Sequence, residues 1–147
     1  MNIAILGFGT VGSGVYDIVE NGDRRMRVTA IFIRPTHPAT MPEMTTNFDA
    51  ILADPNIDVV VEAIGGLHPA YDYILRALQH GKHVVTANKA VVAQHLPEFI
   101  TTAAQHHVRF YFEATTGGGI PWIRNLERAA RIDQIDTIEG IFNGTSN

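Results

Sequence analysis

The feature that most constrains this chain is a glycine-rich turn between a short apolar run and an amphipathic segment. Residues 2–6 lead directly into Gly7-Phe8-Gly9-Thr10-Val11-Gly12, after which apolar residues recur at helical spacing over 11–20. A strand, a G-x-G-x-x-G loop and a helix in this order form the unit in which a dinucleotide pyrophosphate meets a helix N-terminus. The sequence therefore predicts a dinucleotide-binding loop.

The residues of this loop have separate predicted roles. Gly7 allows the tight turn, Gly9 leaves no Cβ in the way of the phosphates, and Gly12 lets the helix pack closely on the strand. Unpaired N–H groups at the first helical turn, including those of Thr10 and Val11, would donate to the anion. A glycine turn that serves packing alone is the alternative interpretation.

Along the rest of the chain, short β-branched runs alternate with longer amphipathic segments. This alternation is typical of an α/β fold, a doubly wound Rossmann-type parallel sheet with helices on both faces. We expect strands at 2–6, 28–33, 59–63, 83–86 and 108–112 and helices at 11–20, 69–80 and 97–105. A short helix capped by Thr46 is also expected, and the prolines of 36–44 are expected to prevent regular structure there.

The last part of the chain suggests a boundary. A helix is expected from Pro121, with Ile123, Leu126 and Ala130 inward and a charged set in solvent, namely Arg124, Glu127, Arg128 and Arg131. Residues 137–142 resemble a strand with no element to pair with, an arrangement that native proteins avoid. We therefore expect 1–134 to form an NAD(P)-binding domain and 135–147 to begin a further domain of a longer protein.

Composition excludes several classes of function. The chain has 147 residues, no cysteine and a formal net charge of −4. Thiol catalysis and cysteine-ligated metals are thereby excluded, and neither Ser13 nor Ser146 lies in a G-x-S-x-G pattern. Without a basic stripe, neither nucleic acid nor an anionic membrane is expected as a partner. No apolar run reaches membrane-spanning length and no signal peptide is apparent, so a cytoplasmic location is expected.

Arg34, at the end of the expected second strand, bears on the choice of cofactor. An acidic residue at this place would bind a ribose 2′-hydroxyl, but the chain has Arg34, which can form a charge-assisted fork to a 2′-phosphate. NADP is therefore the favoured cofactor. If Arg34 is only a surface arginine, NAD can be used as well.

Further polar residues fall where the later strands end, at the sheet edge where such folds bind ligands. Lys89 follows the fourth expected strand and could place a positive charge beside a developing oxyanion or relay a proton; a surface salt bridge is its alternative role. Glu113 follows the fifth strand. Its carboxylate is expected to need a cation or N–H partners, and helix capping is the competing interpretation.

With these motifs in register, the sequence resembles the nucleotide-binding domain of homoserine dehydrogenase. The resemblance covers nearly the whole chain and is carried by five segments, at 7–15, 54–62, 81–90, 118–121 and 140–145. It implies NAD(P)-dependent interconversion of L-homoserine and L-aspartate 4-semialdehyde, on the pathway to threonine and methionine.

The resemblance also implies site residues. The pyrophosphate would lie on Phe8 to Gly12, and the nicotinamide side would be lined by Ile64 and Gly65. Asn88 and the catalytic Lys89 would lie beside cofactor and substrate. A monovalent cation, usually sodium in the family, would be held in the turn after the fifth strand, at positions that match Glu113, Thr116, Gly118 and Ile120.

Homoserine dehydrogenases continue into a second domain that completes the substrate site and forms most of the homodimer interface. We therefore expect this chain to bind cofactor with little or no turnover. One alternative is the nucleotide domain of a glucose-fructose or inositol oxidoreductase, although there an E-K-P sequence replaces the T-A-N-K-A of 86–90. The other is a non-catalytic nucleotide-sensing Rossmann domain, which the sequence following 147 would distinguish.

Overall fold

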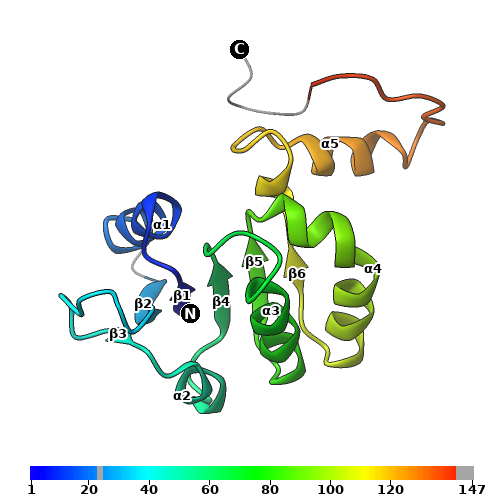
Figure 1. Ribbon diagram of the computed structural model, residues 1–147. Helices are drawn as coiled ribbons and strands as arrows, with labels where there is room; N and C mark the ends of the chain where they lie inside the picture. Colours follow the sequence, from blue (N-terminus) through cyan, green and yellow to red (C-terminus); the bar gives the residue numbers. More distant parts are fainter. Residues whose placement is uncertain (23–24, 142–147) are drawn as a thin grey trace.

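The computed structural model describes residues 1–22 and 25–141, which form one parallel sheet with helices on either side (Figure 1). The strands are β1 (Asn2–Leu6), β2 (Arg27–Phe32), β3 (Met44–Thr45), β4 (Val59–Glu62), β5 (His83–Thr86) and β6 (Phe110–Tyr111). The helices are α1 (Thr10–Glu20), α2 (Phe48–Ala53), α3 (Ala70–Gln79), α4 (Lys89–Gln105) and α5 (Trp122–Ala129), with a 3-10 turn at Glu113–Thr115.

The strand order is β3-β2-β1-β4-β5-β6, and every neighbouring pair is parallel. From β1 the chain builds the sheet outward to β3, and then it returns to the other side of β1 to add β4, β5 and β6. The order therefore reverses between β1 and β4, and a crevice opens above the carboxyl ends of such strands. The predicted doubly wound fold is confirmed.

Alternate residues of each strand pack on opposite faces of the sheet. Ala4 and Leu6 of β1 belong to a buried cluster with α2, α3 and α4, whereas Ile3 and Ile5 belong to a second cluster with Val19 of α1. Both faces of β1 are thus apolar, which is the pattern of a central parallel strand. β1 consequently holds the following glycine loop on a rigid base.

Two short elements depart from the expectations. Of the segment 36–44 that was expected to lack regular structure, residues 36–43 do so, but Met44 begins β3. Beside it, the amide of Ile31 donates to the carbonyl of Glu43 at 2.8 Å. The prolines all precede this pairing and remove no donor from it. The cap of α2 is Asn47 rather than Thr46, since the Asn47 side chain accepts from the Ala50 amide at 3.0 Å.

Helix α4 begins at Lys89 rather than at Pro97, so the expected helix 97–105 is only its second half. The Asn88 side chain accepts from the Val91 amide at 3.3 Å, and Val91 is fully buried. This cap and this buried side chain fix the first turns, and the helix continues through Pro97 although a proline there removes one hydrogen bond and crowds the preceding turn. A proline favoured at helix starts was therefore a misleading signal here.

The helix expected from Pro121 is confirmed as α5, but its inward face and the strand after it are not found as expected. No residue of α5 is buried: Ile123 and Leu126 are half-buried, and Ala130 is exposed. The expected strand 137–142 is not formed over 137–141, and Phe142 lies outside the described residues. Within the described part of the chain this segment has no strand beside it, and an unpaired segment cannot form ladder hydrogen bonds. The charged residues of α5 are exposed as expected.

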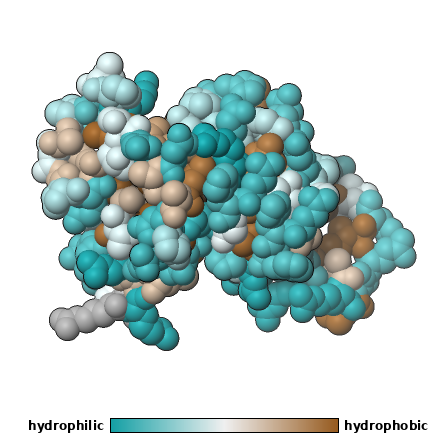
Figure 2. All heavy atoms as spheres, turned by 90° about the horizontal axis from the view of Figure 1, so that it is seen from below, coloured by the Kyte–Doolittle hydropathy of each residue, from teal (hydrophilic) through white to brown (hydrophobic). Residues whose placement is uncertain are grey.

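The two edges of the sheet differ. In Figure 1 the strands point upward, so the carboxyl ends and the glycine loop lie at the top. Figure 2 shows the underside, which is mostly hydrophilic with separate hydrophobic patches. Over the described ranges, none of the helices combines the length and the apolar character needed to cross a membrane.

Candidate functional site

The turn between β1 and α1 is built on two glycines in close contact. Gly7 has φ +92°, a left-handed conformation that side chains disfavour, and its amide donates to the Phe32 carbonyl at 2.9 Å. A Cβ at Gly12 would lie 2.0 Å from the Gly7 carbonyl oxygen. The predicted roles of both glycines, tight turn and close packing, are supported by this geometry.

Gly9 differs from its neighbours because a Cβ there would have no heavy atom within 4 Å. It is the N-cap of α1, and no side chain makes a capping hydrogen bond. The first N–H groups of α1 therefore have no side-chain cap, and the backbone in front of them is open. Such a helix start is suited to an anion.

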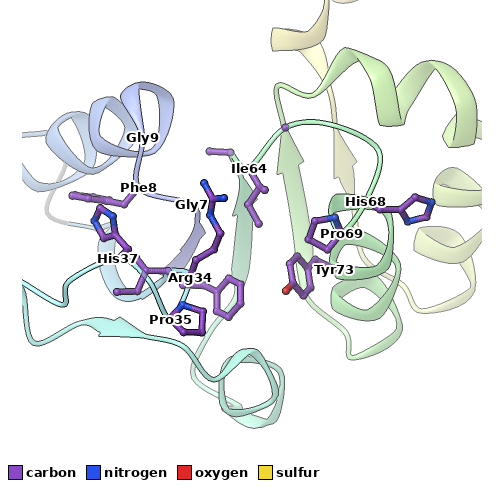
Figure 3. A pocket seen from close by; sticks show the side chains of 14 residues that line it. Gly7, Phe8, Gly9, Arg34, Pro35, His37, Ile64, His68, Pro69 and Tyr73 are labelled. Carbon is purple, nitrogen blue, oxygen red and sulfur yellow. The ribbon is translucent and has the colours of Figure 1, made fainter.

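Beside this loop lies a cavity of about 550 Å³ between the ends of β1, β2 and β4 and the start of α3 (Figure 3). Its lining residues are Gly7, Phe8, Gly9, Phe32, Ile33, Arg34, Pro35, His37, Ala63, Ile64, Gly65, His68, Pro69 and Tyr73. No aspartate or glutamate is among them. The cavity therefore combines apolar walls with basic groups, which fits an anionic ligand with an apolar ring.

Arg34 lies just beyond β2, on the wall of this cavity, and Figure 3 shows its guanidinium pointing toward the level of the glycine loop. Its side chain is exposed and has no hydrogen bond or ion pair with any residue of 1–22 or 25–141. An arginine without an internal partner can bind a ligand without first breaking an ion pair.

The loop after β4 is held by a buried carboxylate. Glu62, the last residue of β4, is 1% exposed, and its Oε1 accepts from the amides of Ile64 at 2.8 Å and Gly65 at 3.0 Å. Gly65 and Gly66 have φ of +80° and +74°. The carboxylate therefore fixes a left-handed turn that brings Ile64 and Gly65 to the cavity wall.

The same carboxylate reaches the next strand. The Thr86 hydroxyl donates to Oε2 of Glu62 at 2.6 Å and accepts from the Asn88 amide at 3.0 Å. The Asn88 side chain in turn donates to the Gly66 carbonyl at 2.6 Å. A closed set of hydrogen bonds thus joins the loops after β4 and β5. No role was predicted for Glu62, although a charged residue that ends an apolar run is a signal in the sequence.

Lys89 is exposed and is the first residue of α4, directly after the buried Asn88. The structure places it at the carboxyl edge of the sheet, as expected, but neither Asn88 nor Lys89 lines the cavity. Asn88 acts on the cavity indirectly, through its hydrogen bond to Gly66.

The remaining predicted residues divide into two groups. Cavity-lining residues predicted from the sequence are Gly7, Phe8, Gly9, Arg34, Ile64 and Gly65, whereas Thr10, Val11 and Gly12 lie outside the lining. His68, Pro69 and Tyr73 on the opposite wall were not predicted, because they come from the loop before α3 and from α3 itself. Tyr73 packs on Phe32 with ring centroids 5.2 Å apart, so its place depends on tertiary packing.

The turn after β6 holds the residues expected at a cation. The half-buried Glu113 accepts from the Arg124 amide, at 3.1 Å from Oε2, in the first turn of α5. The Arg124 amide is thus the expected N–H partner of the Glu113 carboxylate. Because this amide lies at the start of α5, the same contact also serves the expected capping role. Thr116, Gly118 and Ile120 follow in a turn whose Gly117 and Gly118 have left-handed φ of +75° and +63°.

Comparisons with known proteins agree with this geometry. The family model for the NAD-binding domain of homoserine dehydrogenase matches residues 7–113. A homoserine dehydrogenase of Synechocystis sp. is 44% identical over all of this chain, which covers 36% of that protein. A relative from Lactococcus lactis is 37% identical, again over all of this chain and 38% of its own length.

A solved homoserine dehydrogenase from Thiobacillus denitrificans superposes with a TM-score of 0.83 and is 35% identical. This alignment covers 92% of the chain and 34% of that protein. The chain therefore spans about a third of the length of the relatives it matches. The matched region includes the glycine loop, the cavity walls and the hydrogen-bonded loops after β4 and β5. This chain belongs to the family of the homoserine dehydrogenase NAD-binding domain.

Proposed function

We propose that this chain binds NADP across the carboxyl edge of the sheet, with the diphosphate over the start of α1. The observation that carries the proposal is the open backbone at Gly9, in front of a helix start without a side-chain cap. The amides of Thr10 and Val11 in the first turn of α1 would donate to the phosphate oxygens. Gly12 contributes by packing, through its contact with Gly7.

Arg34 supports NADP over NAD. Among the described residues, Arg34 is the one permanently charged group on the cavity wall, and no described carboxylate lies there to accept a hydrogen bond from a ribose 2′-hydroxyl. A 2′-phosphate beside Arg34 would form a charge-assisted fork. NAD would fit the same cavity with lower affinity, because its adenosine ribose offers no anion to this guanidinium.

The reaction proposed for the whole enzyme is the interconversion of L-homoserine and L-aspartate 4-semialdehyde. When bound, the nicotinamide supplies or accepts the hydride. Ile64 and Gly65 would hold its ring at the cavity wall, with Glu62 fixing their backbone. The Lys89 ammonium, at the same sheet edge, would neutralise negative charge on the substrate oxygen or carry its proton.

The relatives are almost three times as long as this chain, so the substrate site and a homodimer interface are proposed to lie in the part that only they contain. Hydride transfer needs both reactants in near-attack geometry, which this chain alone would not provide. We propose that it binds cofactor with little turnover. No observation within 1–22 and 25–141 favours a sugar oxidoreductase or a nucleotide sensor.

A sodium ion at Glu113, Thr116, Gly118 and Ile120 is also proposed. The donor chemistry fits: backbone carbonyls are hard oxygen ligands, and two left-handed glycines shape the turn that carries them. Thermal unfolding in sodium chloride and in choline chloride of equal ionic strength tests it. A tenfold excess of sodium over its Kd should stabilise the folded chain by about 1.4 kcal/mol, and identical melting temperatures would rule out the ion.

The functional proposal is tested by a turnover assay and a cofactor-binding assay. Reduction of aspartate 4-semialdehyde is followed with residues 1–147 and with the full-length Synechocystis relative, and NADPH binding is followed by fluorescence. We expect binding by the chain with turnover at least about a thousandfold below that of the relative, because one half of the reacting pair is not held in place. Turnover comparable with that of the relative would contradict the proposal that this chain binds cofactor with little turnover.

A further inference from the structure

The turn that follows β2 carries two nitrogen groups that could reach the same ligand. The amide of His37 donates to the Arg34 carbonyl at 2.9 Å, which closes a four-residue turn with Pro35 at its second position. A turn of this kind keeps the Cα atoms of its first and fourth residues within about 7 Å of each other. Proline at its second position restricts its backbone. Arg34 and His37 are therefore held side by side.

Both side chains are directed toward the cavity. Figure 3 shows the Arg34 guanidinium and the His37 imidazole projecting to the same side of the turn, and both residues line the cavity together with Phe8 of the glycine loop. Both are exposed, and within the described ranges neither side chain has a hydrogen bond or an ion pair. A histidine held free at an anion site can gain its proton when the anion binds.

We propose that His37 is a second cationic contact for the 2′-phosphate of NADP, and that its protonation makes the preference for NADP over NAD increase as the pH falls. This inference rests on the proposed function, because it requires the 2′-phosphate to lie beside Arg34. It adds a pH-dependent contact to the constant charge of Arg34.

The other titratable groups around His37 do not replace it. Arg34 shares its turn, and His68 and Tyr73 line the opposite wall of the cavity. On the α1 side, Tyr16 packs edge-on against Phe8, and burial, followed by the charges of Glu43, Glu20 and Asp17, raises its pKa. None of these three carboxylates lines the cavity, so none competes there with a phosphate for the imidazolium.

The sign of the effect separates this contact from the titration of the ligand. A phosphate monoester has a second pKa of about 6, so between about pH 8.5 and 6.5 it loses charge as the pH falls, and its own titration weakens NADPH binding. An imidazole gains charge as the pH falls, and beside the phosphate that charge strengthens NADPH binding. A preference for NADPH that rises toward lower pH therefore has the sign of a protonating histidine and is opposite to the sign that the phosphate alone would give.

The test measures the Kd of NADPH and of NADH by calorimetry at about pH 6.5 and pH 8.5 with the 147-residue chain. We expect the ratio of Kd for NADH to Kd for NADPH to be about two- to fivefold larger at the lower pH, the range of an exposed ion pair. His37→Gln should abolish this change and leave NADH affinity as it was. His106→Gln, at an exposed position after α4, is the matched control and should behave like the unsubstituted chain.

Several outcomes would overturn the inference. If both cofactors bind and the ratio of Kd for NADH to Kd for NADPH is flat or falls toward lower pH, His37 does not contact the 2′-phosphate as a cation. That result leaves the proposed function intact. Loss of the pH dependence in His68→Gln but not in His37→Gln assigns the effect to the other wall. Absence of binding by either cofactor overturns both the inference and the proposed function.

Discussion

The Thr86 hydroxyl donates a 2.6 Å hydrogen bond to the buried carboxylate of Glu62. Because the other oxygen of that carboxylate accepts from two amides of the following loop, one side chain ties the carboxyl ends of β4 and β5 together. The cavity wall formed by Ile64 and Gly65 therefore depends on a residue that does not itself line the cavity.

Glu62→Gln tests this coupling. The amide nitrogen of glutamine cannot accept from Thr86, so the buried Thr86 hydroxyl loses its charged acceptor, and we expect a loss of about 1–3 kcal/mol in the free energy of unfolding. NADPH and NADH affinity should fall by similar factors, because the proposed contact of this loop is with the nicotinamide, which both cofactors contain. Urea unfolding and cofactor titration measure the two effects. Glu127→Gln, on the exposed face of α5, is the control, and equal behaviour of the two variants would refute the coupling.

Gly12→Ala should damage the β1–α1 turn. The new Cβ would lie 2.0 Å from the Gly7 carbonyl oxygen, so the helix must shift, and we expect a loss of about 2 kcal/mol or more of stability. Gly14→Ala, in the same helix, has nothing within 4 Å and should be neutral or stabilising by up to about 1 kcal/mol. Urea unfolding compares them, and similar midpoints would show that Gly12 is not a packing position.

Gly9→Ala should separate binding from folding. The Cβ meets no protein atom within 4 Å, so the free energy of unfolding should fall by about 1 kcal/mol or less, the cost of alanine at an N-cap. The same Cβ would stand where the diphosphate approaches, and we expect the Kd of NADPH and NADH to rise at least about tenfold, equivalent to about 1.4 kcal/mol. Unchanged affinity for both cofactors would place the diphosphate elsewhere.

Arg34→Asp should change the cofactor preference. The carboxylate repels a 2′-phosphate and can accept from a ribose hydroxyl, so NADPH should bind about 10–100 times more weakly while NADH affinity stays the same or improves. Arg131→Asp makes the same charge change after α5 and serves as the control. Fluorescence titration of both cofactors measures the effect. Equal losses of affinity for NADPH and NADH would rule out the charge-assisted pair between Arg34 and the 2′-phosphate.

Most of the fold could be predicted because its signals are local. β1 and β5 have the expected bounds, as β-branched runs with sharp ends, and α1 ends at Glu20 before Asn21 as expected. β3 could not be predicted, since a two-residue strand exists only through its pairing with β2. The predicted start of α4 at Pro97 was wrong, because the cap at Asn88 and the burial of Val91 outweigh the preference of proline for a first turn.

The site divides in the same way. Gly7, Gly9 and Arg34 were predictable because each lies at a fixed distance along the chain from the first strand. Tyr73 and His68 reach the cavity only through the packing of the segment around α3, which no spacing in the sequence encodes. The role of Glu62 depends on a hydrogen bond to a residue 24 positions away.

The central claim is that a nicotinamide dinucleotide lies over the start of α1. Isothermal titration calorimetry of the folded 147-residue chain with NADPH and with NADH tests it most directly. We predict one site per chain for both cofactors, with NADPH bound at least about tenfold more tightly, a difference of about 1.4 kcal/mol. No binding heat at millimolar concentrations of either cofactor, with a cooperative unfolding transition showing that the protein is folded, would contradict the account.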